Sequence, residues 1–220
     1  MLERRDPYLN GAFVPGDGRE AVIDPGTGEI VAHVTTLSRA RVRQALADAD
    51  AAWPAWRARS AKQRGDALLA IARHLEADRD AVARLLTREN GKPLAQSQTE
   101  VDVSVDHLRW FAEEGRRAYG RVIPPQADGK RNLTVRVPIG VVGAISPWNF
   151  PLMLAVRKVA PAPAAGCPVV LKPATKTPLC ALAFADCAHR AQLPPGVFQV
   201  VLGDAREIGA ELLENPACRK

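Results

Sequence analysis

The sequence predicts an α/β fold in which a helical layer and a β-hairpin precede a doubly wound, parallel, Rossmann-like sheet that is incomplete. In the first half, apolar residues recur at helical spacing between about residues 38 and 119. In the last third, short apolar runs alternate with helical segments, which is typical of parallel α/β sheets. We therefore divide the chain into residues 1–119, 120–137 and 138–220.

The N-terminal residues 1–35 carry strand and turn signals. Asn10-Gly11 lies between apolar flanks, a pair that favours a tight hairpin turn, so residues 8–14 are expected to form strand, turn and strand. A second turn is predicted over residues 24–28, followed by a strand over 29–35. Together with the helical layer that follows, these strands are assigned to the segment 1–119.

Three helices are predicted next, over about residues 38–59, 61–88 and 93–119. Ser38 is placed to cap the first helix, and Pro54 is expected to kink or end it. Asn90-Gly91 ends the second, because these residue types tolerate the left-handed conformation. Trp110 and Phe111 fall at helical spacing in the third, and we expect both in the core.

Residues 120–137 change to period two, which indicates two strands, 121–124 and 133–137, joined by a polar loop. A hairpin that projects from a helical layer has strand edges whose backbone groups are unpaired, so we expect it to be an oligomerisation element. The sheet that follows is expected to be half built and to expose an apolar edge.

Composition excludes several classes of protein. The 220 residues are 47% hydrophobic, with no apolar run of 18 residues that would indicate a membrane span and no N-terminal apolar signal segment. The net charge is +6, but the basic residues are scattered rather than clustered, so no nucleic-acid partner is predicted. The four cysteines lack metal-type spacing, which favours a reduced, cytoplasmic protein without a metal site.

The stretch from Val141 to Pro151 organises the last third. Residues 141–145 form a short apolar run that predicts a buried strand, Pro147 stops it, and Pro151 is placed to open a helix. The loop between lies at the carboxyl end of a parallel strand, where open α/β sheets bind ligands. No G-x-G-x-x-G fingerprint accompanies it.

Two more strands, 169–172 and 197–202, alternate with helices over 152–165, 179–192 and 206–214. Pro163 lies inside the first of these helices, where an interior proline costs about 3 kcal/mol or more. It marks either a divergent sequence or a helix already broken near Pro161.

Several motifs in register now define a resemblance. Ser-Pro-Trp-Asn-Phe-Pro at 146–151, Ala-Ala-Gly-Cys-Pro-Val-Val-Leu-Lys-Pro-Ala at 164–174 and Leu-Pro-Pro-Gly-Val-Phe at 193–198 resemble the aldehyde dehydrogenase superfamily, as does Glu-Asn-Gly-Lys-Pro-Leu at 89–94. Among its groups the chain is most similar to the NAD(P)-dependent succinate-semialdehyde dehydrogenases. The resemblance covers essentially the whole chain and implies the N-terminal portion of that fold.

The resemblance implies a role for Asn149, whose side-chain amide would help to form the oxyanion hole that stabilises charge on the aldehyde oxygen. The alternative is that Asn149 caps the helix after Pro151. Arg157 matches an arginine that binds the distal carboxylate of succinate semialdehyde through its two-pronged guanidinium group. The alternative there is a salt bridge or a solvated helix face.

The resemblance also implies a nicotinamide cofactor. Lys172 would bond the adenosine ribose, and Thr175 stands where NAD-preferring relatives often carry a glutamate that repels a 2′-phosphate. With Lys176 nearby, NADP is therefore favoured over NAD. The alternative for Lys172 is an ordinary solvated lysine at a strand end, for Thr175 a helix cap, and for Gly203 an ordinary turn. The implied cofactor-binding residues are Ile145, Ser146, Pro147, Trp148, Lys172, Pro173, Ala174, Thr175 and Gly203.

The nucleophilic cysteine and general-base glutamate of the superfamily lie beyond the matched segment, and none of the four cysteines stands in for that nucleophile. We therefore expect this chain alone to be inactive. As part of a whole enzyme it would act on a small aldehyde within a homo-oligomer. Two alternatives stay open: a non-catalytic nucleotide-binding or dimerisation module, and nucleic-acid binding whose affinity would fall steeply with salt.

Overall fold

The computed structural model describes residues 4–220; residues 1–3 of the predicted N-terminal segment lie outside it. The central sheet has the strand order β2-β1-β9-β8-β7, with β7, β8 and β9 parallel and β1 antiparallel to β9. Its strands are β1 (Tyr8–Leu9), β2 (Ala12–Phe13), β7 (Val142–Ile145), β8 (Val169–Lys172) and β9 (Phe198–Val200). The predicted parallel strands and the predicted hairpin over residues 8–14 are confirmed, and the position of that hairpin at one edge of the central sheet is an addition.

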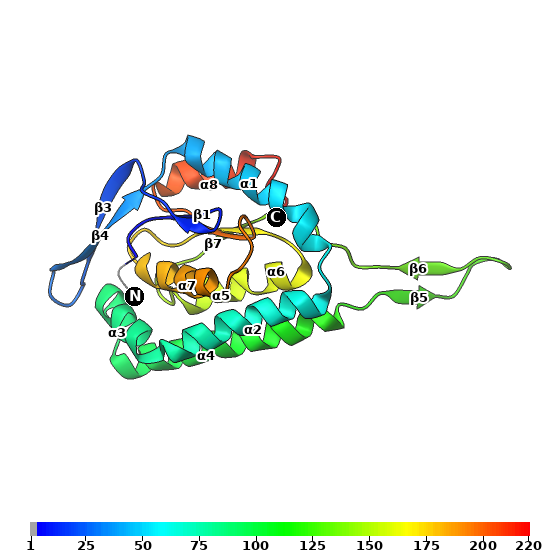
Figure 1. The fold of residues 1–220 in the computed structure, drawn as a ribbon, viewed down its shortest axis with the longest axis horizontal. Helices are drawn as coiled ribbons and strands as arrows, with labels where there is room; N and C mark the ends of the chain where they lie inside the picture. Colours follow the sequence, from blue (N-terminus) through cyan, green and yellow to red (C-terminus); the bar gives the residue numbers. More distant parts are fainter. Residues whose placement is uncertain (1–3) are drawn as a thin grey trace.

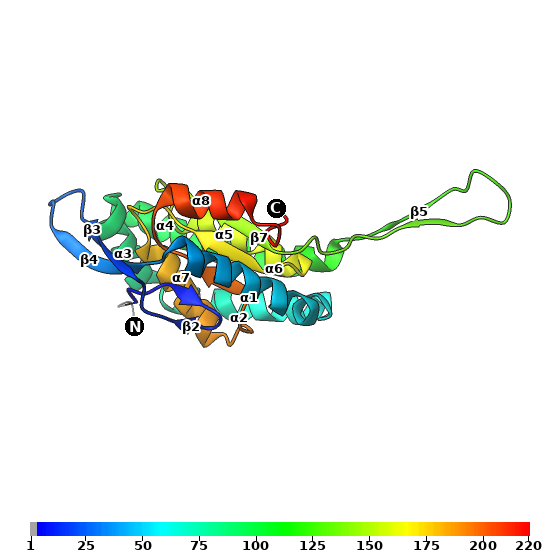
Figure 2. The ribbon, with the colours of Figure 1, turned by 90° about the horizontal axis from the view of Figure 1, so that it is seen from above.

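Helices cover both faces of this sheet (Figures 1 and 2). Alternate residues of a strand point to opposite faces, so Val170 packs with α1 and α8, whereas Val169 and Leu171 join the larger core with α2, α4 and α7. The helices are α1 (Arg39–Arg57), α2 (Ala61–Ala77), α3 (Arg79–Asn90), α4 (Leu94–Glu114), α5 (Met153–Val159), α6 (Pro161–Ala165), α7 (Leu179–Arg190) and α8 (Ala205–Glu214). The predicted doubly wound arrangement is therefore present.

The helical layer departs from prediction at two places. The expected helix over 61–88 is two helices, α2 and α3, divided at Asp78. The apolar repeat continues across this single residue, so periodicity could not reveal the break. Helix α1 runs through Pro54 to Arg57, so Pro54 does not end it. Trp56 is buried, and its Nε1 donates to the carbonyl of Pro163 at 3.1 Å.

Helix α4 ends at Glu114, and a short 3₁₀ turn, Gly115–Arg117, follows it. The expectation of a core Trp110 is wrong, because its side chain is 62% exposed, while Phe111 packs against the core. Neighbouring residues of a helix point about 100° apart, so both rings could not face the same core. The helix expected over 152–165 is two helices, and α6 begins at Pro161, which agrees with the alternative of a helix broken there.

Two further pairs of strands stand apart from the central sheet. The hairpin β5 (Arg121–Ile123) and β6 (Asn132–Thr134) projects as a long arm, which confirms the predicted hairpin (Figures 1 and 2). Strands β3 (Gly18–Ile23) and β4 (Ile30–Thr36) form a second sheet. Strand β3 was not predicted, because Gly18-Arg19-Glu20 gives it little apolar alternation.

The outer edge of β7 is partly covered within the chain. The amide of Gly143 donates to the carbonyl of Lys220 at 2.8 Å, and that of Arg219 donates to Val141 at 2.8 Å. Residues 218–220 therefore run along the edge that was expected to be bare. Among residues 4–220, no helix has the length and apolar character that crossing a membrane would require.

Candidate functional site

Three loops meet where the parallel strands end. Ile145 of β7 lies opposite Lys172 of β8, and the amide of Ser146 donates to the carbonyl of Lys172 at 3.1 Å. The amide of Val201 donates to Leu171 at 2.9 Å, so β9 ends at the same edge. The loops 146–152, 173–178 and 201–204 therefore share the carboxyl edge of the sheet, the usual ligand site of such folds.

The 146–152 loop is held by the segment that joins α3 to α4. Asn90 Nδ2 donates to the carbonyl of Trp148 at 2.7 Å. Lys92 Nζ donates to the carbonyl of Asn149 at 2.8 Å and lies 4.2 Å from the ring centroid of Phe150. The backbone of the loop is thus fixed, while the side chain of Asn149 is exposed.

Glu100 of α4 completes this arrangement. One carboxylate oxygen lies 2.5 Å from Lys92 Nζ, and the other accepts from the amides of Leu152 and Met153 at 3.0 and 3.1 Å. Leu152 is the N-cap residue of α5 and makes no side-chain cap bond. Glu100 therefore satisfies the helix start, and the alternative that Asn149 caps this helix is wrong.

Lys172 lies at the end of β8 and is only 3% exposed. Its Nζ donates to the carbonyl of Pro173 at 2.7 Å and to Thr175 Oγ1 at 3.1 Å. Burial lowers the pKa of Lys172, while the carboxylates of Glu20 and Asp204 act in the opposite direction. An ammonium group has three donors, so Lys172 keeps one for another acceptor.

The helix after this loop is capped from a distance in the same way. The carboxylate of Glu89, at the end of α3, accepts from the amides of Leu179 and Cys180 at 2.7 and 2.8 Å. The N-cap residue of α7 is Pro178, so the alternative that Thr175 caps this helix is wrong. Burial raises the pKa of Glu89 to about 7, although its bonds with Cys180 and Leu179 favour the charged form.

A cleft of about 740 Å³ opens beside these loops. It is lined by Glu20, Ala21, Ile23, Pro25, Glu89, Asn90, Trp148, Thr175, Lys176 and Thr177. The Thr177 hydroxyl, which lines the cleft, and the buried Ser146 hydroxyl in the neighbouring loop have no hydrogen-bond partner within the described part of the chain. Unsatisfied buried hydroxyls are costly, so these loops fit a ligand rich in hydrogen-bonding groups.

The other predicted site residues divide into two groups. Ile145, Pro147 and Trp148 are exposed at the strand ends, whereas Pro173 is buried and Ala174 half-buried in the next loop. Arg157 is exposed on α5 and does not line the cleft. Burial of His107 on α4 lowers the pKa of that histidine, and the positive charge of Arg157 lowers it further.

Gly203 has a structural explanation of its own. Its φ is +144°, and a Cβ there would lie 2.8 Å from the carbonyl oxygen of Leu37. The amide of Leu37 in turn donates to the carbonyl of Leu202 at 2.7 Å. Close packing against this loop therefore accounts for a glycine at position 203 without a ligand.

The cysteines are unlike a thiol nucleophile. Cys167, Cys180 and Cys187 are buried, and burial raises the pKa of the Cys180 and Cys187 thiols and also that of the half-buried Cys218. The thiolate is the reactive form, and an activated cysteine has a lowered pKa. Among residues 4–220, no group of three histidine, cysteine or acidic side chains could hold a metal ion.

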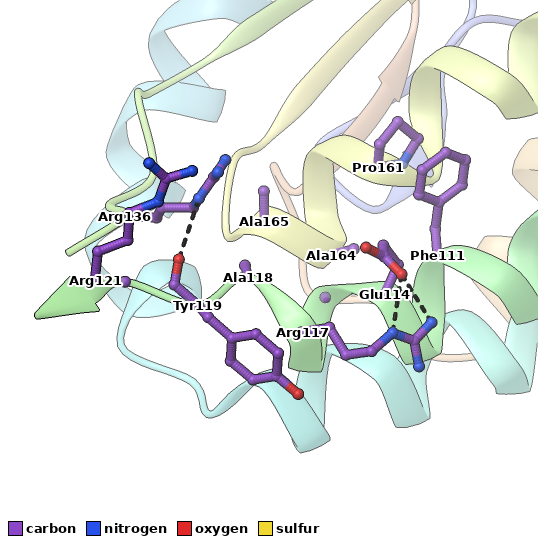
Figure 3. A pocket seen from close by; sticks show the side chains of 12 residues that line it. Phe111, Glu114, Arg117, Ala118, Tyr119, Arg121, Arg136, Pro161, Ala164 and Ala165 are labelled. Carbon is purple, nitrogen blue, oxygen red and sulfur yellow. Dashed lines mark hydrogen bonds and ion pairs between the residues drawn. The ribbon is translucent and has the colours of Figure 1, made fainter. Parts of the chain in front are cut away.

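A smaller cavity of about 480 Å³ lies at the base of the hairpin (Figure 3). Arg117 on its wall is paired with Glu114 at 2.7 Å, and Arg136 Nε donates to the carbonyl of Tyr119 at 3.3 Å. None of the predicted site residues lines it. We therefore take the carboxyl edge of the sheet, and not this cavity, as the candidate site.

Sequence reasoning missed Glu89 and Glu100 as parts of the site. Glu89 belongs to the recognised 89–94 motif, but its contact is with residues 90 and 91 positions away. Glu100 lies on a helix where an acidic residue predicts only a solvated face. Their burial, at 2% and 3% exposure, identifies them only in the folded chain.

Comparison with known proteins agrees with this geometry. The family model described as the aldehyde dehydrogenase family matches residues 13–220. The chain belongs to the aldehyde dehydrogenase family.

Its relatives include enzymes named for semialdehydes. The chain is 46% identical to a glutarate-semialdehyde dehydrogenase of Pseudomonas aeruginosa and 43% identical to a succinate-semialdehyde dehydrogenase [NADP(+)] of Escherichia coli, in each case over all of this chain and 46% of the relative. It superposes on the crystal structure of a succinate-semialdehyde dehydrogenase from Burkholderia pseudomallei with a TM-score of 0.98 and 43% identity, covering 100% of this chain and 46% of that one. The chain spans about half the length of the curated relatives it matches.

Proposed function

We propose that this chain supplies the oxyanion-forming loop and part of the cofactor site of an NAD(P)-dependent aldehyde dehydrogenase. The intact enzyme would oxidise a small aldehyde to a carboxylic acid in the cytoplasm, with succinate semialdehyde or a similar carboxylated aldehyde as substrate. The observation that carries the proposal is the fixed backbone and exposed side chain of Asn149 at the carboxyl edge of the sheet.

The role of Asn149 follows from charge. When a nucleophile adds to an aldehyde carbonyl, negative charge develops on the oxygen, and a prearranged donor stabilises it more than mobile water would. Lys92 holds the backbone carbonyl of Asn149, and Glu100 accepts from the first amides of α5, so the side chain of Asn149 is not used to cap that helix. Loss of one such donor costs about 10²- to 10³-fold in rate.

The cofactor part of the proposal rests on the donors of the 173–178 loop. Lys172, Thr175 and Lys176 would hold the adenosine ribose and its 2′-phosphate, and the unpartnered Thr177 hydroxyl fits a polar ligand. When bound, the nicotinamide ring would accept a hydride from the substrate. Because Thr175 carries no negative charge, we propose that NADP is preferred.

Arg157 completes the proposal as the group that binds the distal carboxylate of the substrate. It is exposed in the last turn of α5, about two turns beyond Asn149. Its guanidinium group can bind a carboxylate through two parallel hydrogen bonds.

A second candidate is a non-catalytic nucleotide-binding or dimerisation module. The raised pKa of three of the four cysteines favours it for the isolated chain, because no thiol there is activated. This module would have the same cofactor site as the proposed aldehyde dehydrogenase and would differ from it only in having no catalytic turnover.

Binding of NADP⁺ and NAD⁺ to the purified chain, measured by calorimetry, tests the proposal. We expect saturable binding that favours NADP⁺ and that Lys172→Ala weakens about tenfold or more, since it removes a charged donor. Thr175→Glu should reverse the preference, because a carboxylate repels the 2′-phosphate.

Lys62→Ala, on a surface lysine paired with Asp66, is the matched control and should bind as the unmodified chain does. Absence of binding by a chain that circular dichroism shows to be folded would refute a cofactor half-site. Because this chain alone is expected to be inactive, binding without NADPH formation from succinate semialdehyde agrees with both candidates, whereas NADPH formation would exclude the non-catalytic module.

A further inference from the structure

The segment 89–100 reaches both loops of the candidate site, although none of its residues was assigned a role. Asn90 and Lys92 bond the carbonyls of Trp148 and Asn149, and Glu89 and Glu100 bond the first amides of α7 and α5. The first four amides of any helix lack partners within the helix and are usually capped by a neighbour in sequence. Here both helices take their caps from the junction of α3 and α4.

The consequence for the loops is direct. Each loop runs from a strand end to a helix start, and with both ends held its path is fixed. The capping positions are occupied by distant carboxylates, so neither Asn149 nor Thr175 uses its side chain to cap a helix. The side chain of Asn149 remains available to a ligand, and the Thr175 hydroxyl, which accepts from Lys172, can still donate to one.

We propose that Glu89 and Glu100, together with Lys92, are positioning residues: Glu89 sets the 173–178 loop and Glu100 with Lys92 sets the 146–152 loop. The inference rests on the proposed function of those loops, but the contacts belong to this chain. It assigns to the Glu-Asn-Gly-Lys motif a task beyond joining two helices.

The burial of the ion pair supports a positioning role. The side chains of Lys92 and Glu100 are 10% and 1% exposed, and Glu100 makes three hydrogen bonds, one to Lys92 and two to amides. A buried charge persists only where its partners are fixed, so the pair requires a defined loop geometry. A solvated pair would place no such demand.

Hydrogen exchange measured by mass spectrometry tests the assignment, because it reads single loops without requiring activity. In Glu100→Ala, the amides of Leu152 and Met153 should exchange about 10- to 100-fold faster, as expected for a lost bond to a charged acceptor, while those of Leu179 and Cys180 stay protected. Glu89→Ala should show the reverse pattern. Glu100→Gln, which keeps an acceptor oxygen, should restore part of the protection.

Asn90→Ala and Lys92→Met serve as milder variants if the alanine variants of the glutamates do not fold. Lys92→Met should speed exchange in the 146–153 peptide alone, and the surface variant Lys62→Met should change neither peptide. Equal loosening of both loops by every variant, or unchanged exchange in all of them, would overturn the proposal.

Affinity for NADP⁺ separates this inference from the proposed function. Glu89→Ala should weaken NADP⁺ binding about tenfold or more, as expected if one bond to a charged group is lost from the bound geometry. If the unmodified chain binds no cofactor but the exchange patterns hold, the proposed function fails and the positioning role stands. If the chain binds NADP⁺ and the exchange patterns are absent, only the positioning role fails.

Discussion

At the scale of the residue, Glu89 shows how burial and hydrogen bonding compete. Glu89 is 2% exposed, and burial raises its pKa from 4.5 to about 7, while its hydrogen bonds with Cys180 and Leu179 of α7 act to lower that pKa. A raised carboxyl pKa means that the folded chain binds the proton more tightly than the unfolded chain does. The stabilisation is fully present below about pH 4.5 and is lost as the pH rises to about 7.

Glu89→Gln provides the reference that isolates this effect. We expect the free energy of unfolding of the unmodified chain, relative to Glu89→Gln, to fall by on the order of 3 kcal/mol between about pH 4.5 and pH 8. Urea unfolding at a series of pH values measures it. A flat difference for Glu89→Gln would contradict the raised pKa.

At the scale of the element, α8 is stabilised at its start and weakened in its middle. The Asp204 carboxylate accepts from the amides of Arg206 and Glu207, both at 2.9 Å, and caps the helix. Gly209 lies inside α8, and a Cβ there would meet nothing within 4 Å. Glycine in a helix interior has a larger entropic cost of folding than alanine.

Two substitutions in α8 should therefore act in opposite directions. Asp204→Ala should lower the free energy of unfolding by about 0.5–2 kcal/mol, and Gly209→Ala should raise it by about 0.5–1 kcal/mol. Thermal and urea unfolding of both variants measure the change. If both substitutions changed the free energy of unfolding in the same direction, the cap and the interior glycine would not control the stability of α8.

At the scale of the whole molecule, the β5–β6 arm is the feature that a single chain does not explain. Its apolar side chains face solvent, with Val122 81% and Leu133 69% exposed, and Val135 and Val137 beyond β6 are exposed to 77% and 76%. The arm leaves the body of the molecule and offers open strand edges (Figure 2). Such edges and side chains favour pairing with another chain.

We expect the chain to self-associate through this arm. Val122→Lys and Val135→Lys should lower the weight-average mass of the chain at a given concentration in sedimentation velocity, because charges in the arm oppose both strand pairing and apolar contact with another chain. Leu213→Lys, at an 85% exposed leucine on α8, is the matched control and should leave the mass unchanged. Equal sedimentation of all three variants and the unmodified chain would exclude the arm as an interface.

Apart from β3 and the division between α2 and α3, the sequence by itself determined the order of the elements, the three parallel strands, the projecting hairpin and the family, because each depends on residues close together in the chain. Asn10-Gly11, Gly91 and Pro161 mark turns and helix ends by their own backbone preferences. Only the tertiary structure decided which residues hold the site. Glu100 and Glu89 contact amides 52 and 91 positions away, and a carboxylate becomes a helix cap there only because folding buries it beside unpaired amides that water can no longer reach.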